Sequence, residues 1–126
     1  MRRKNSRAGF GFTIIELLVA IVIIGVLATI IFVSYTGVQK KAAVNTLKYD
    51  LKNASTRLEV DVSRNGSYPL SEGAANDGKG LPKSTGTVYQ YTLADNEYCL
   101  SATSTNSGNA VFHISSTNGS TENGAC

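Results

Sequence analysis

A long apolar segment near the start of the chain is the strongest constraint on its fold. Residues 17–34 carry no charged side chain, and the wider span from Ile14 to Val33 has the length of ~20 residues that crosses a hydrocarbon core as a helix. Glu16 lies just inside this segment. Because a charge at the edge of a lipid-facing helix is costly, we expect Glu16 to have a function and a partner of opposite charge.

Cleavage of the chain beside this segment would create such a partner. A cut between Gly11 and Phe12 places the new amino group of Phe12 four residues before Glu16, and residues i and i+4 lie on the same face of a helix. In a single subunit, the amine could neutralise its own carboxylate. In a bundle of such helices, it could instead reach the carboxylate of a neighbour and fix the axial register between subunits.

The residues around this cut resemble the type IV pilin and pseudopilin family. Precursors of that family have a short basic leader, a Gly-Phe processing site and a glutamate at the fifth position of the mature chain. Four residues match this pattern position by position: Gly11, Phe12, Thr13 and Glu16. A second pair, Gly9-Phe10, also occurs, but only a cut after Gly11 makes Glu16 the fifth residue.

The resemblance implies a processing pathway. A prepilin peptidase would remove the basic leader, residues 1–11, and would then methylate the amino group of Phe12. The ion pair between Phe12 and Glu16 would set the register of assembly. An ordinary single-pass membrane anchor is the alternative; it explains the apolar segment and the basic leader, but not the glutamate or the Gly-Phe spacing. A secretory signal peptide fits less well, because its apolar stretch is only ~7–15 residues long.

The positive charge of the chain is concentrated in the leader. Twelve basic and nine acidic residues give a formal net charge of +3, and four of the basic residues precede the cut: Arg2, Arg3, Lys4 and Arg7. Residues 12–126 retain eight basic and nine acidic side chains. The basic balance therefore indicates a signal that keeps the leader in the cytoplasm, and it does not predict a nucleic-acid surface.

An amphipathic helical pattern follows the apolar segment. Apolar residues recur at intervals of three and four on one stripe: Val44, Leu47, Leu51, Ala54, Leu58 and Val62. Asn65-Gly66 is the expected stop, since glycine accepts the left-handed conformation that ends helices. We therefore expect one long helix from about Phe12 to Arg64, apolar over residues 12–34 and amphipathic over residues 35–65.

Gly25 lies inside the apolar half and is a candidate point of helix flexibility. A glycine in a helix costs up to about 1 kcal/mol relative to alanine. Gly25 matches a family glycine near which the helix loosens in some assembled filaments. The family often has a proline eight residues later, where this chain has Val33. Local melting and close packing of helices at Gly25 both stay open.

The rest of the chain predicts a small antiparallel sheet. Residues 66–86 hold both prolines and five glycines, and we expect them to form a connecting loop. Three segments rich in strand-forming residues follow, at residues 87–93, 97–103 and 110–115. The expected fold class is α+β: the long N-terminal helix packs on an antiparallel meander of about three strands within residues 87–126.

Cys99 and Cys126 are the only cysteines of the chain. With the leader in the cytoplasm, the chain after about residue 34 lies outside it, where disulfides persist. An intramolecular bridge would tie the polar C-terminal tail to the second strand and contribute about 3–3.5 kcal/mol through loop closure. Two free thiols or an intermolecular bridge are the alternatives.

The sequence contains no pattern that indicates catalysis, so we do not expect an enzyme, a cofactor or a metal site. His113 is the only histidine, and no Cys-x-x-Cys pair, phosphate loop or nucleophile elbow occurs. The acidic residues around Asp95 do not have the spacing of a calcium loop. Lys79 and Lys83 could contact DNA phosphates, although two lysines on a loop are usually just solvated.

These features together predict a structural subunit of a type IV pilus filament, a main subunit acting in motility, adhesion or attachment. The expected partners are further copies of this chain in a helical filament, the prepilin peptidase, an assembly ATPase with its inner-membrane platform, and membrane lipid before assembly. A DNA or surface ligand stays open. We expect a single-pass precursor in the cytoplasmic (inner) membrane and a mature extracellular filament. The alternatives are a pseudopilin or competence-type subunit for secretion or DNA uptake, and a membrane-anchored binding domain that does not polymerise.

Overall fold

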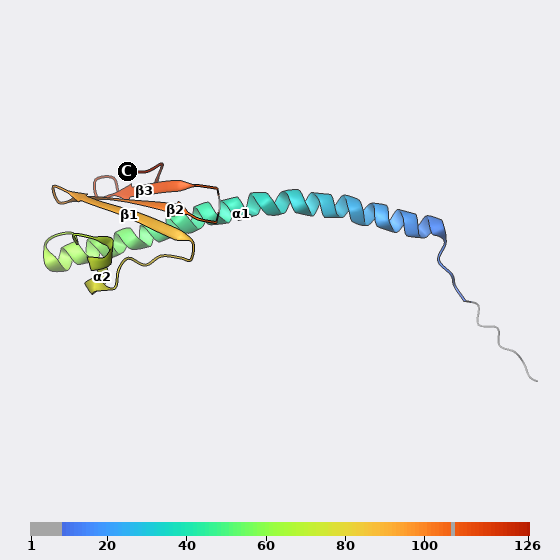
Figure 1. Cartoon of the computed structure of the whole chain (residues 1–126), viewed down its shortest axis with the longest axis horizontal. Coiled ribbons are helices and arrows are strands. Elements are labelled where there is room, and N and C mark those ends of the chain that lie inside the picture. The colour runs from blue at the N-terminus through green and yellow to red at the C-terminus, as the bar shows by residue number, and fades with distance from the viewer. Residues whose placement is uncertain (1–8, 107) are drawn as a thin grey trace, which may run out of the picture. The chain divides into compact units, whose positions relative to one another are not determined.

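The structure, a computed structural model, describes residues 9–106 and 108–126. It divides into two units, residues 1–36 and residues 37–126, and helix α1 (Ile14–Asn65) contributes to both. Figure 1 labels the elements in chain order. The α+β class is confirmed, with a long N-terminal helix, an antiparallel sheet and a disulfide near the C-terminus.

The first unit contains an extended segment and the apolar part of α1. Residues 9–13 are not helical, and α1 begins at Ile14 instead of at the predicted Phe12. Every large apolar side chain from Ile14 to Val33 is at least 51% exposed. Such a surface needs lipid or other apolar helices around it. By length and composition, α1 is able to cross a membrane.

In the second unit, one face of α1 is covered. The four central residues of the predicted stripe are buried: Leu47, Leu51, Ala54 and Leu58. Val44 and Val62, at the two ends of the stripe, are half-buried. The helix ends at Asn65, and Gly66 has a φ of +80°, which is the left-handed conformation expected at this stop.

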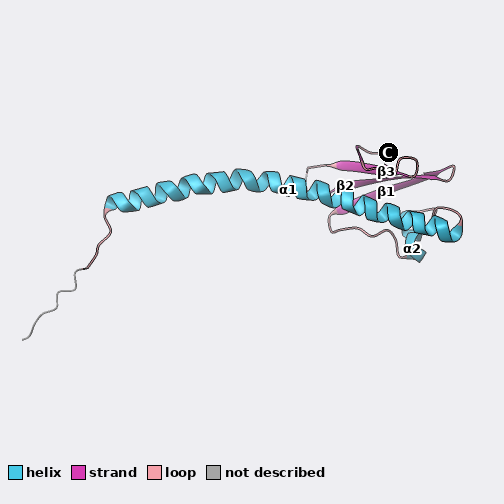
Figure 2. Ribbon diagram, turned by 180° about the vertical axis from the view of Figure 1, so that it is seen from behind, coloured by secondary structure: helices cyan, strands magenta, loops and turns pink. Residues whose placement is uncertain are grey.

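A four-stranded antiparallel sheet in the order β1-β2-β3-β4 covers this face. Figure 2 shows β1, β2 and β3 beside the second half of α1. Its strands are β1 (Thr87–Ala94), β2 (Glu97–Ser104), β3 (Val111–Ser115) and β4 (Glu122–Asn123). The first three correspond to the predicted meander, and Asp95 and Asn96 form the expected turn with φ of 51° and 61°. β4 is additional; the sequence did not predict it, because two polar residues show no strand pattern.

The register of the sheet places its apolar side chains toward α1. Tyr89 pairs with Ala102, and Leu100 pairs with Ile114. All four side chains are at least nine-tenths buried, together with Tyr98. They pack with the leucines of α1 into one core, and this core holds the sheet against the helix.

The connection between α1 and β1 contains two short helices, η1 (Glu72–Ala74) and α2 (Ala75–Gly78). Two buried carboxylates of α1 hold this connection in place. Asp61 accepts a hydrogen bond of 2.7 Å from the backbone N–H of Asn76. Asp50 accepts three hydrogen bonds from Ser84 and Thr87. The sequence did not predict these contacts, since nothing in it shows which acidic residues face inward.

Candidate processing and assembly site

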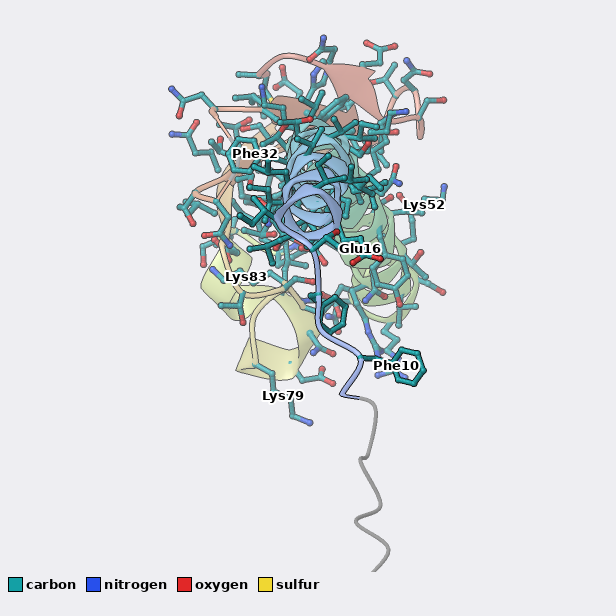
Figure 3. The ribbon with its side chains drawn as sticks, turned by 90° about the vertical axis from the view of Figure 1, so that its right-hand side faces the viewer. Phe10, Glu16, Phe32, Lys52, Lys79 and Lys83 are labelled. Atoms are coloured by element: carbon teal, nitrogen blue, oxygen red, sulfur yellow. A yellow bond between two sulfur atoms is a disulfide. The ribbon has the colours of Figure 1, made fainter. Side chains whose placement is uncertain are left out.

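The proposed scissile bond lies in the extended segment that precedes α1. Gly11 is exposed, and the side chain of Phe12 is 92% exposed. Figure 3 shows this segment between the labelled residues Phe10 and Glu16, the latter in the first turn of α1. A protease acts on backbone that is exposed and not held in regular structure. The conformation of residues 9–13 fits that requirement.

Glu16 closes the first turn of α1 through Thr13. The backbone N–H of Thr13 donates to Oε2 of Glu16 at 2.9 Å, and the Thr13 hydroxyl donates to the same oxygen at 3.0 Å. In return, the backbone N–H of Glu16 lies 3.2 Å from Oγ1 of Thr13, which accepts its hydrogen bond. This reciprocal arrangement is a capping box, and it explains why the helix begins at Ile14.

The sequence contained the signal for this cap. Thr13-Ile14-Ile15-Glu16 has the Ser/Thr-x-x-Glu spacing of a capping box, placed directly before an apolar run. Glu16 therefore has a local structural role in the uncut chain, in addition to the role in register that we expected. The acidic side chain is also favourable at the positive end of the helix dipole.

The cap leaves one oxygen of Glu16 for another donor. Both bonds from Thr13 end at Oε2, and Oε1 accepts no hydrogen bond from residues 9–106 or 108–126. None of the ion pairs found in this part of the chain involves Glu16. In the uncut chain, the nitrogen of Phe12 is an uncharged amide, so the expected pair of Phe12 and Glu16 stays a prediction about the processed protein.

Gly25 lies in an uninterrupted stretch of α1. A Cβ added at Gly25 would meet no other heavy atom within 4 Å, so the single chain does not need a glycine at this position for space. One residue further on, the carbonyl of Val26 accepts a second hydrogen bond, from the hydroxyl of Thr29 at 2.7 Å. Such bonds often bend helices. Flexibility at Gly25 stays a prediction.

The predicted disulfide is confirmed between Cys99 on β2 and Cys126, with the two Cα atoms 6.0 Å apart. The tail is also held by His113 on β3, whose Nδ1 lies 3.0 Å from the carbonyl oxygen of Gly124. Nε2 of the same ring lies 3.6 Å from the carboxylate of Glu122. His113 therefore helps to fasten the C-terminal tail, which is a structural role.

A cluster of tyrosines lies where the connection meets the sheet. The ring of Tyr98 contacts Tyr68 edge to face at 4.9 Å and lies parallel to Tyr91 at 6.3 Å. Burial, together with the hydrogen bond to Glu59, raises the pKa of Tyr68 to about 12. Burial likewise raises the pKa of Tyr91 to about 12. These hydroxyls stay protonated and serve as donors that fasten the connection.

The two lysines considered for DNA contact differ in their surroundings. Lys83 donates to Glu72 at 3.1 Å, and its ammonium lies 5.7 Å from the centre of the Tyr89 ring. Its charge is thus compensated within the chain. Lys79 is exposed and follows α2. One exposed lysine does not make a phosphate-binding surface.

Comparison with known proteins points to the same segment. A family model described as "Prokaryotic N-terminal methylation motif" matches residues 5–32, which include the Gly11-Phe12 bond and Glu16. The chain carries this motif. The resemblance to the type IV pilin and pseudopilin family is thereby confirmed for its N-terminal segment.

Two curated relatives extend the similarity beyond the motif. Type II secretion system core protein G of Klebsiella michiganensis is 33% identical over 72 residues, which are 57% of this chain and 49% of that protein. Fimbrial protein EcpB of Eikenella corrodens is 39% identical over 56 residues, which are 44% of this chain and 35% of that protein. The chain thus spans half or less of the length of these relatives.

Proposed function

We propose that this protein is a structural subunit of a type IV pilus filament. The observation that carries the proposal is the placement of Glu16 as the fifth residue after an exposed Gly11-Phe12 bond, at the start of an apolar helix. The methylation motif over residues 5–32 and the similarity to a fimbrial protein support it. The role is structural, and we expect no catalytic activity.

Processing is the first step of the proposed mechanism. The precursor would lie in the cytoplasmic membrane with its leader in the cytoplasm, and a prepilin peptidase would cut after Gly11 and methylate Phe12. The new ammonium group of Phe12 can then donate to Oε1 of Glu16 in a neighbouring subunit, while Thr13 holds Oε2. The cap therefore orients the carboxylate for the incoming amine.

Assembly would move the apolar part of α1 from lipid into a bundle of identical helices. Lipid and such a bundle are similarly apolar, so burial alone drives little association. An assembly ATPase and its inner-membrane platform would supply the work. The Phe12–Glu16 pair would supply register, because a charge left unpaired in this setting costs several kcal/mol.

A pseudopilin is the second candidate function. It is favoured by the similarity to a type II secretion system core protein, which extends over more of this chain than the fimbrial match does. The two functions predict different assemblies: a pilus subunit is recovered in long extracellular fibres after cells are sheared, whereas a pseudopilin forms short fibres within the envelope.

Replacement of Glu16 tests the filament function itself. We expect the Glu16→Ala protein to insert into the membrane normally. Its incorporation into filaments should fall by at least about tenfold, because the lost ion pair is worth several kcal/mol. Thr13→Ala removes the cap and keeps the acid, so it should lower incorporation less than Glu16→Ala does, because the charge stays and only its orientation is lost. A Glu16→Ala protein that forms filaments in normal amounts contradicts the proposed role of the ion pair.

A further inference from the structure

The charges of the second unit are unevenly distributed along α1. Residues 37–57 carry five exposed basic side chains: Lys40, Lys41, Lys48, Lys52 and Arg57. The one acidic residue in this stretch, Asp50, is buried and is fully engaged with Ser84 and Thr87. All exposed charges on this part of the helix are therefore positive.

Three of these lysines lie on the same face of the helix. Lys41, Lys48 and Lys52 are spaced by seven and four residues, and we call them the lysine ridge. The ammonium of Lys48 lies 5.1 Å from the centre of the Phe112 ring, and that of Lys52 donates to the carbonyl of Gly119 at 3.4 Å. Like charges four residues apart repel each other. An anionic partner would remove that repulsion.

A complementary acidic surface lies at the β1–β2 turn. Asp95 and Glu97 flank this turn, and both are exposed. Figure 1 shows the turn between β1 and β2 at the end of the second unit where α1 ends. Beside the turn is a hollow of about 260 Å³, lined by the carboxylates of Asp95 and Glu97, by Thr92, Ser115 and Thr117, and by Ala94, Tyr98 and Cys99. Two carboxylates and three hydroxyls suit the ammonium group of a lysine, and the apolar part of the lining suits its methylene chain.

The two surfaces do not meet within one chain. Lys52 contacts Gly119, and Glu97 accepts a bond of 3.4 Å from the hydroxyl of Thr117, so the turn at residues 116–119 lies between them. No ion pair joins the ridge to Asp95 or Glu97 in the described part of the chain. The turn at residues 116–119 thus separates the ammonium group of Lys52 from the carboxylate of Glu97.

We propose that the lysine ridge of one copy of this chain docks against the Asp95–Glu97 hollow of a second copy. The inference rests on the proposed filament function and names the surface by which the extracytoplasmic parts of neighbouring subunits recognise each other. The contact joins two different surfaces, so it is heterologous and can propagate into an open helical assembly. Its charges select partner and register more than they add affinity.

Crosslinking of filaments tests the contact directly. A carbodiimide joins a lysine amine to a carboxylate only when the two are in contact. In sheared filaments of the full chain, we expect crosslinked peptides that join Lys41, Lys48 or Lys52 to Asp95 or Glu97, and we expect none in detergent-dispersed monomer. Filaments that give other crosslinks but never this set overturn the proposal.

Charge reversal provides a test with an internal rescue. We expect Glu97→Lys, and separately Lys48→Glu with Lys52→Glu, to lower the yield of sheared filaments by about tenfold, because like charges then face each other. The combination of all three substitutions should return the yield to within about threefold of wild type. Lys79→Glu, which reverses an exposed cation far from both surfaces in sequence, is the matched control and should have no effect. Thermal unfolding of each variant in detergent should match wild type.

The outcomes separate this inference from the proposed function. If wild-type protein forms filaments and Glu97→Lys forms them equally well, the docking contact is wrong and the filament function stands. If wild-type protein keeps its leader and forms no filaments, both are wrong. The lysine substitutions could instead leave the filament yield unchanged and lower only the binding of the subunit to vesicles of anionic lipid. In that case the ridge binds lipid headgroups, and the proposed partner is wrong.

Discussion

The buried carboxylate of Asp50 offers a sharp test of how the second unit is held together. It is 3% exposed and accepts bonds from the Ser84 N–H at 3.0 Å, the Ser84 hydroxyl at 2.8 Å and the Thr87 hydroxyl at 2.6 Å. Together these bonds fasten the connection and the start of β1 to α1. Replacement of Asp50 by alanine removes all three acceptor contacts at once.

The structure sets the size of the expected loss. Each hydrogen bond to a charged acceptor contributes about 1.5–3 kcal/mol net, and an unsatisfied buried donor costs about 1–3 kcal/mol. Ser84 is half-buried and can recover water, whereas Thr87 is 6% exposed and cannot do so easily. We therefore expect Asp50→Ala to lower the free energy of unfolding by about 3–5 kcal/mol, and Asp50→Asn, which keeps one acceptor oxygen, by about 1–2 kcal/mol.

Urea unfolding of the full chain in detergent, followed by the near-ultraviolet circular dichroism of the tyrosine cluster, measures these values. Asp77→Asn is the matched control: the Asp77 carboxylate is 3.7 Å from Arg64, both side chains are 67% exposed, and asparagine accepts the φ of +57° at this position, so the expected loss is below about 1 kcal/mol. An Asp50→Ala variant that loses less than about 1 kcal/mol would refute the conclusion that this carboxylate organises the connection.

The disulfide, the tyrosine cluster and the cap of α1 each give a further prediction. Cys99→Ser with Cys126→Ser should lower the free energy of unfolding by about 3 kcal/mol in urea unfolding; an unchanged midpoint would contradict a stabilising bridge. Burial raises the pKa of Tyr68 and Tyr91 to about 12, so both keep their protons in the folded chain while the unfolded chain loses them near pH 10. Their contribution to stability should therefore be constant below about pH 10 and be lost as the pH rises toward 12; unfolding at pH 9 and pH 11 measures this, and Tyr68→Phe with Tyr91→Phe should weaken the dependence. Thr13→Ala should cost the first turn of α1 about 1 kcal/mol and speed amide exchange of residues 14–17 by about fivefold, whereas Thr29→Ala should leave these residues unchanged.

The sequence predicted the elements that depend on periodicity and on local motifs. The stripe from Leu47 to Leu58 is buried as its spacing requires, and Asn65-Gly66 ends the helix. The turn at Asp95-Asn96 joins β1 and β2 as expected. Each of these signals lies within a short window of the chain, which is why it is visible without a structure.

The sequence did not predict contacts between residues that are distant in the chain, nor elements whose residues show only a weak strand or helix pattern. β4 has only two residues, and its pairing to β3 depends on the tail being held by Cys126 and His113. Asp50 and Asp61 resemble solvated helix residues until the fold brings donors to them. The Thr13-x-x-Glu16 spacing is a local signal for the capping role of Glu16, which was not among the predictions made from the sequence.

The N-terminal residue of the protein recovered from cells tests the central claim most directly. The account predicts, by mass spectrometry of the intact chain and of its first peptide, a polypeptide that begins at a methylated Phe12. A functional protein that retains residues 1–11, or that is cut at Gly9-Phe10 so that Glu16 is no longer the fifth residue, would contradict it.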